Sequence, residues 1–186
     1  HVPYLDDYNK KNGTTLKAVA SVHFEPLGIY PGKVSSIDAI PEGAQIAIPN
    51  DTSNEARALL LLEKAGLIKL KEGVGLEATI NDIAENPKNL DIVEIEAAQT
   101  VKVLQDVAVA VINGNFALSN GLSASKDALL VEDSSSDAAS TYANVIVVKE
   151  GNENSDKTKA LIKAVTSEET KKFINEKWQG AVVPVF

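Results

Sequence analysis

Arg57 stands where a cation is unfavourable unless an anion lies in front of it. It falls in the first turn of the helix that the apolar run 59–62 predicts, just after the turn residues 49–51. The first turn carries the positive end of the helix dipole and disfavours a cation by up to ~1 kcal/mol. Free N–H groups at this end, together with a guanidinium that grips both oxygens, make a carboxylate-binding site. The alternatives at this point are a local ion pair between Arg57 and Asp51, or a solvated arginine.

Asparagines that follow or interrupt apolar strands are further candidates for binding a polar ligand. Asn113 and Asn115 follow the continuous apolar run 107–112, and Asn144 lies inside the apolar stretch 142–148. An amide in a buried strand must find hydrogen-bond partners or its burial is costly. The alternative for each asparagine is a hydrogen bond in a turn or at a sheet edge.

Aromatic residues in the first part of the chain are candidates for the wall of a pocket, with plain core packing as the alternative. These candidates are Tyr4, His23, Phe24 and Tyr30. His23 and Glu25 also form a candidate acid and base. The sequence has no nucleophile elbow and no phosphate-binding glycine loop, so nucleophilic catalysis is not favoured.

The composition excludes several classes of function. A net charge of −8 leaves no basic surplus for a nucleic-acid backbone. The chain has no cysteine and only two histidines, which excludes thiol catalysis and the usual zinc sites, so we expect no metal and no cofactor. The sequence contains no apolar run of membrane length.

Strands and helices alternate along the chain, which predicts an α/β fold with mainly parallel sheets. Strands are expected at 16–22, 46–48, 90–95, 107–112 and 142–148, and helices at 3–12, 52–65, 97–105 and 156–178. Thr52 and Glu55 have the spacing of a capping box at the start of the second helix, and Ser167 can cap the second segment of the last. The serine-rich stretch 133–140 is expected to link two lobes. Ligands of such folds lie beyond the carboxyl ends of strands, and this is the kind of position that 50–57 and 113–115 each occupy.

Five blocks of the sequence together resemble the NlpA family of methionine-binding lipoproteins, the substrate-binding components of methionine ABC importers. The blocks are HVPYLD (1–6), VHFEPLGIY (22–30), IPND with NEARALLLL (48–51 and 54–62), VINGN (111–115) and GAVVP (180–184). They occur in order at consistent spacing, so the resemblance covers essentially the whole chain.

The resemblance implies a two-lobed periplasmic-binding-protein fold of type II, whose lobes close over an amino acid without catalysing a reaction. The expected first lobe comprises 1–43 and 134–186, and the second comprises 44–133. The family's opening βαβ unit is absent from this sequence, so we expect the first lobe to be incomplete and to favour self-association.

The resemblance also implies which residues bind the ligand. The family's carboxylate-gripping arginine falls on Arg57, and its two ligand-binding asparagines fall on Asn113 and Asn144. Its aromatic side-chain pocket falls on Tyr4, His23 and Tyr30.

The implied ligand is L-methionine or a close relative, and the implied partner is an ABC permease in the cytoplasmic membrane. An extracytoplasmic protein, lipid-anchored to the cell membrane in its full-length form, is expected, although the lipidated cysteine is absent from this sequence. One alternative is the same family with another ligand, such as a methionine-containing dipeptide or oxidised methionine. The other is an enzyme on the same fold that uses His23 and Glu25.

Overall fold

A computed structural model describes residues 1–134 and 137–186, which form two compact units. Unit 1 comprises His1–Pro26 and Asp133–Phe186, and unit 2 comprises Leu27–Glu132. The sequence placed residues 27–43 in the first lobe, whereas the structure places them in unit 2. The reason is that β2 (Gly28–Pro31) pairs with strands of unit 2 on both of its sides.

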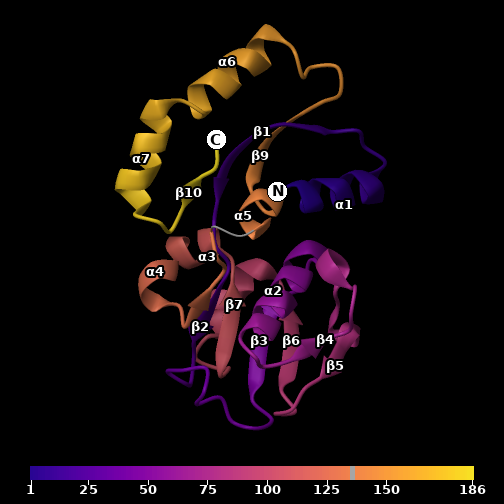
Figure 1. Ribbon diagram of the computed structural model, residues 1–186, viewed down its shortest axis with the longest axis vertical. Coiled ribbons are helices and arrows are strands. Elements are labelled where there is room, and N and C mark those ends of the chain that lie inside the picture. Colours follow the sequence, from indigo (N-terminus) through magenta and orange to yellow (C-terminus); the bar gives the residue numbers. More distant parts are fainter. Residues whose placement is uncertain (135–136) are drawn as a thin grey trace. The chain divides into compact units, whose positions relative to one another are not determined.

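Unit 2 is built on a five-stranded sheet in the order β6-β3-β7-β2-β8 (Figure 1). The other strands of this sheet are β3 (Gln45–Pro49), β6 (Asp91–Ile95), β7 (Val109–Ile112) and β8 (Leu130–Val131). β3 pairs in parallel with β6 and β7, but β2 is antiparallel to β7 and β8. The prediction of mainly parallel sheets is therefore wrong. Residues 32–44 contain only turns and bends, and without a crossover helix the chain returns antiparallel to β2.

The remaining elements of unit 2 are mostly short. They are α2 (Thr52–Lys64), β4 (Lys69–Leu70), β5 (Ile83–Glu85), α3 (Gly114–Ser119), α4 (Ala124–Asp127) and the 3-10 helices η1 (Gly75–Glu77), η2 (Ile80–Asp82) and η3 (Ala97–Val103). The helix expected at 97–105 is thus a 3-10 helix. β4 and β5 pair with each other in a separate antiparallel ribbon.

Strand β7 is buried on both faces, as its continuous apolar run predicted. Val109 and Val111 belong to the apolar cluster that contains α2, whereas Ala110 and Ile112 belong to a second cluster with Tyr30. All four residues of β7 have no exposed surface. The sheet of unit 2 therefore separates two apolar layers, and its strands are fixed from both sides.

Helix α2 begins one residue earlier than the predicted capping box allows. Asp51 is the N-cap, with extended backbone, and its carboxylate accepts from the backbone N–H of Asn54 at 3.2 Å. Thr52 already lies inside the helix, so the predicted Thr52/Glu55 capping box is wrong. An aspartate at this position also complements the positive end of the helix dipole.

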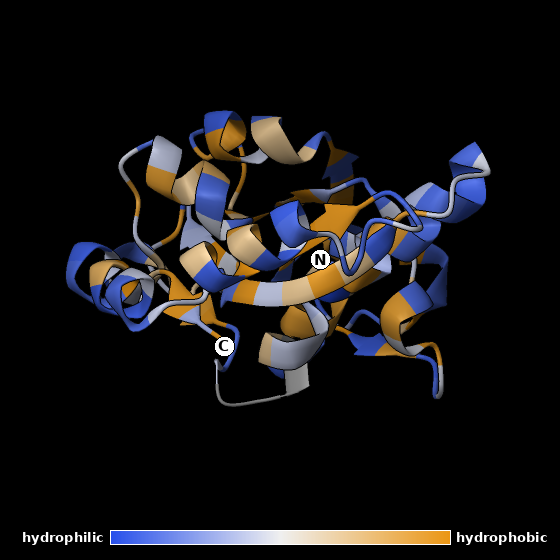
Figure 2. Ribbon diagram, turned by 90° about the horizontal axis from the view of Figure 1, so that it is seen from above, coloured by the Kyte–Doolittle hydropathy of each residue, from blue (hydrophilic) through white to orange (hydrophobic). Residues whose placement is uncertain are grey.

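Unit 1 has a three-stranded antiparallel sheet in the order β10-β1-β9. Its elements are α1 (Val2–Asn12), β1 (Lys17–Phe24), α5 (Asp137–Thr141), β9 (Asn144–Val148), α6 (Asp156–Val165), α7 (Glu168–Trp178) and β10 (Val183–Pro184). Ser167 caps α7, as predicted, by accepting from the backbone N–H of Thr170 at 3.2 Å. Most helices carry both hydrophilic and hydrophobic residues (Figure 2). None of the described helices is long and apolar enough to cross a membrane.

The serine-rich stretch 133–140 was predicted to link two lobes, and unit 1 resumes at its first residue, Asp133. Residues 135 and 136 lie outside the described part of the chain, and α5 begins directly after them at Asp137. Unit 1 has a small apolar cluster of Phe24, Ala139 and Tyr142. This cluster is much smaller than those of unit 2.

Candidate functional site

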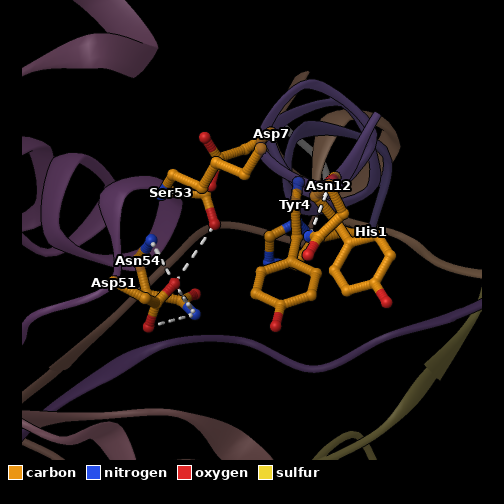
Figure 3. Close-up of polar contacts among 9 residues, drawn as sticks. His1, Tyr4, Asp7, Asn12, Asp51, Ser53 and Asn54 are labelled. Atoms are coloured by element: carbon orange, nitrogen blue, oxygen red, sulfur yellow. Dashed lines mark hydrogen bonds and ion pairs between the residues drawn. The ribbon is translucent and has the colours of Figure 1, made fainter. Parts of the chain in front are cut away.

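Two polar segments of unit 2 meet at the carboxyl ends of the neighbouring strands β3 and β7. The side-chain amide of Asn113 donates from Nδ2 to Asn54 Oδ1 at 3.0 Å. Asn54 Nδ2 in turn donates to both carboxylate oxygens of Asp51, at 2.9 and 3.1 Å (Figure 3). Asp51 Oδ1 also accepts from the hydroxyl of Ser53 at 3.2 Å. The start of α2 is therefore tied to the end of β7 through side chains.

Asn113 keeps one polar atom without a partner. Its Oδ1 is buried and has no hydrogen-bond partner among the described residues. Its Nδ2 donates to Asn54, and its Oδ1 can act only as an acceptor. A buried acceptor without a partner costs free energy, and an N–H donor such as an ammonium group would satisfy it.

Arg57 is the only arginine among the 186 residues, and its side chain is 4% exposed. Its Nε donates to Glu132 Oε1 at 2.6 Å, and its Nη2 donates to Glu132 Oε2. This bidentate partner is neither the Asp51 side chain nor solvent, the two alternatives that the sequence left open. The structure thus holds the guanidinium in a fixed orientation. Arg57 lies in the second turn of α2, which begins at Thr52, and not in the first turn as the sequence predicted.

Glu132 also ties together the two points at which the chain enters and leaves unit 2. Its Oε2 accepts from the backbone N–H of Leu27 at 2.8 Å, and its own N–H donates to the Leu27 carbonyl at 3.0 Å. Gly28, the next residue, pairs with Val131 on one side and with Ile112 on the other. Glu132 therefore lies at the same edge of the sheet as the end of β7.

Sequence reasoning missed Glu132 and Asn54. Glu132 is 75 residues from Arg57 in the chain, so no local spacing connects them. The available signal was a carboxylate directly after the apolar residues 129–131, at the end of a strand. Asn54 lies in one of the blocks noted above, but its role depends on contact with Asn113 across the sheet edge.

Three other predicted residues lie in unit 1. Asn144 opens β9 and stands opposite His23 on β1. Asn144 and Tyr4 line one cavity of about 270 Å³, together with Leu5, Tyr8 and other residues of α1 and β9. His23 Nε2 lies 3.0 Å from Glu25 Oε1. Unit 1 therefore brings Tyr4 and Asn144 together and places His23 beside Asn144.

Tyr30 lies in the core of unit 2 and has no exposed surface. Its ring belongs to the apolar cluster with Ala47 and Ile112, and its hydroxyl has no partner among the described residues. Burial, and to a lesser extent the charge of Asp127, raises the pKa of Tyr30 to about 12. This placement matches the alternative of core packing and not the predicted pocket wall.

Histidine, aspartate and glutamate side chains do not gather into a metal site in the described residues. The site consists of the buried Arg57–Glu132 ion pair, the Asn113–Asn54 amide pair and the Asp51 cap. They lie at one edge of the sheet of unit 2, which contains both parallel and antiparallel strands. Such an edge is where α/β folds bind small ligands.

The fold is that of the periplasmic-binding-protein class, of type II. The nutrient-binding protein from Burkholderia cenocepacia, solved bound to methionine, superposes on this chain with a TM-score of 0.94 at 44% identity, over 100% of this chain and 77% of that one. Lipoprotein Tp32 from Treponema pallidum superposes with a TM-score of 0.93 at 43% identity, over 100% of this chain and 76% of that one.

The sequence profile of the family described as NlpA lipoprotein matches residues 1–186, and the chain belongs to this family. The D-methionine-binding lipoprotein MetQ of Escherichia coli K12 is 44% identical over 185 residues, which cover 98% of this chain and 67% of MetQ. The membrane lipoprotein TpN32 of Treponema pallidum is 43% identical over 183 residues, which cover 98% of this chain and 67% of TpN32. None of these proteins is named as an enzyme, and catalysis by His23 and Glu25 is set aside.

Proposed function

We propose that this chain binds methionine, or a close relative of it, as the substrate-binding component of an ABC importer. In this proposal it delivers the ligand to a permease of the cytoplasmic membrane. The observation that carries the proposal is the polar edge of unit 2. A buried guanidinium and a buried amide acceptor complement the carboxylate and the ammonium group of an amino acid.

The similarity to proteins that bind methionine supports the choice of side chain. One relative is a D-methionine-binding lipoprotein, and one structural neighbour was solved with methionine bound. The apolar cavity of unit 1 is the candidate site for the thioether, with Tyr4 and Asn144 in its lining. An unbranched, polarisable thioether suits an apolar wall, whereas an unpaired charge there would be costly.

Unit 2 supplies Arg57 and Asn113 in this proposal, and unit 1 supplies Asn144, Tyr4 and His23. Tyr30 is not included, because it is a core residue of unit 2.

The proposal also covers location and self-association. The full-length protein is extracytoplasmic and lipid-anchored, as its membership of a lipoprotein family suggests. Copies of this chain associate through unit 1, where β9 is an edge strand of the described sheet, and where Val147 of β9 and Tyr8 of α1 are exposed. Light scattering tests this part: a monomer at all accessible concentrations would contradict it.

A thermal-shift screen tests the ligand. The screen includes both enantiomers of methionine, oxidised methionine, methionine-containing dipeptides and the other amino acids. A ligand at a hundred times its Kd stabilises the folded state by about 2.7 kcal/mol. We expect methionine or a close relative to give the largest shift. Glutamate or lysine ranking above methionine would contradict the proposal.

A further inference from the structure

The ion pair between Arg57 and Glu132 leaves the candidate site without net charge from these two residues. Their side chains are 4% and 9% exposed, so both charges are removed from water. Two of the guanidinium N–H groups are directed at Glu132, one from Nε and one from Nη2. A guanidinium carries five N–H donors in all, and its bond to one carboxylate is compatible with contact to a second.

A second carboxylate on Arg57 would bring an unbalanced negative charge to this edge. Asp51 adds a further negative charge at the start of α2, where its carboxylate accepts from Asn54. Because a buried net charge is costly, a simple carboxylate is a poor ligand here. An amino acid is a better one, because its ammonium group balances its carboxylate and Asn113 Oδ1 is a buried acceptor for it.

We propose that Glu132 is a specificity-determining residue: by neutralising Arg57, it makes the site select a zwitterionic amino acid over a carboxylate that lacks the amino group. This inference rests on the proposed function. It assigns to Glu132 a role in the choice of ligand, in addition to the hydrogen bonds by which it joins Leu27.

Substitution of Glu132 by glutamine tests the role of the charge. Glu132→Gln retains the shape and one acceptor oxygen but removes the negative charge that faces Arg57. Calorimetry on the full-length protein compares methionine with its deaminated analogue, methylthiobutanoate. We expect the affinity ratio of methionine to the analogue to fall by about tenfold or more, which corresponds to ~1.4 kcal/mol. Any general loosening of the site affects both ligands alike and cancels in the ratio.

The matched control is Glu85→Gln. Glu85 is also paired within unit 2, to Lys69 at 3.1 Å, but both side chains are more than half exposed. We expect this variant to leave the ratio unchanged. An unchanged ratio in Glu132→Gln, whether both affinities fall or neither does, would overturn the inference. Wild-type protein that binds neither compound would overturn the proposed function, and the inference with it.

A measurement on the wild-type protein keeps the inference testable if Glu132→Gln does not fold. Arg57 is the only arginine in these 186 residues. In NMR spectra of protein with isotope-labelled arginine, these residues therefore give one Nε–H signal, and its loss in Arg57→Lys identifies it. We expect this signal to keep its ion-paired chemical shift when methionine is added, because Glu132 remains bound to Arg57. A shift on addition of methionine to the value of an unpaired guanidinium would show that the ligand displaces Glu132, and the inference would be wrong.

Discussion

The two units hold their candidate ligand-binding residues in different ways. In unit 2, Arg57 and Glu132 are 4% and 9% exposed and hold each other through two hydrogen bonds. In unit 1, Tyr4 is 50% exposed and lines an open cavity on a three-stranded sheet. The charged groups of the proposed site are therefore fixed before a ligand arrives, which lowers the entropic cost of binding. The apolar groups lie on the unit with the smaller core.

The largest expected effect is on the stability of unit 2. Arg57→Ala leaves Glu132 buried without its cation, and we expect a loss of about 3–5 kcal/mol in the free energy of unfolding. Lys69→Ala removes the cation of an exposed pair and should cost about 0–1 kcal/mol. Equilibrium unfolding in urea measures both values. Equal, small losses would show that the pair does not fix the site.

Replacing both Arg57 and Glu132 distinguishes the cost of an unpaired buried charge from the loss of the ion pair itself. The double variant Arg57→Met, Glu132→Leu removes the ion pair and leaves no uncompensated charge, so most of the stability lost in Arg57→Ala should return. A double variant no more stable than Arg57→Ala would indicate that the Leu27 contact of Glu132, and not the ion pair, dominates.

A smaller effect is expected at Asn144, a candidate ligand-binding residue of unit 1. Asn144→Ala should weaken methionine binding by about 1–3 kcal/mol through lost hydrogen bonds. Gln45→Ala is the control, because Gln45 is exposed and opens β3 at the end opposite to Asn50. Calorimetric titration distinguishes the two. An unaltered affinity in Asn144→Ala would remove Asn144 from the proposed site.

The sequence predicted the buried strand β7, the helix that carries Arg57, and the placement of 50–57 and 113–115 after strand ends. These follow from local patterns, because an apolar run, a turn and a helix start each depend on the types of consecutive residues. It could not predict Glu132 as the partner of Arg57, because that contact joins residues far apart in the chain. It also predicted mainly parallel sheets, whereas β2 is antiparallel to both of its neighbours, and it misjudged the environment of Tyr30. Both depend on how β2 pairs within unit 2, which the residues around β2 do not reveal.

A smaller effect on stability tests whether Tyr30 is a core residue or part of the wall of the binding pocket. Tyr30→Phe removes a buried hydroxyl that has no partner among the described residues. We expect the free energy of unfolding to rise by up to about 1 kcal/mol, since an unsatisfied polar group is removed. Methionine affinity should be unchanged. A tenfold loss of affinity would place Tyr30 in the binding pocket after all.

The smallest effect is a dependence of stability on pH. Burial, together with hydrogen bonding and charge from Glu94, raises the pKa of Glu55, against a lowering by the Ile80 N–H. The folded state therefore binds this proton more tightly than the unfolded state. Its stabilising contribution is complete below the ordinary glutamate pKa and is lost as pH rises through the raised value. Glu55→Gln should raise Tm at neutral pH but not in acid.

Asp82 provides a comparison, because its pKa is shifted in the opposite direction to that of Glu55. Hydrogen bonds from Thr79 lower the pKa of Asp82, so its contribution is present above the ordinary aspartate pKa and is lost as pH falls. Asp82→Asn should therefore reduce the difference in Tm between neutral and acidic solution. Thermal melts across this range check both variants. The same pH response in both would contradict the assigned causes.

Calorimetric titration of methionine into the double variant Arg57→Met, Glu132→Leu tests the central claim most directly. This variant lacks the guanidinium but carries no unpaired buried charge, so a loss of binding cannot be attributed to unfolding once its melt is cooperative. The account predicts a loss of about 2–4 kcal/mol in binding free energy, because the α-carboxylate has no charged partner. A folded double variant that binds methionine as tightly as the wild type would contradict it.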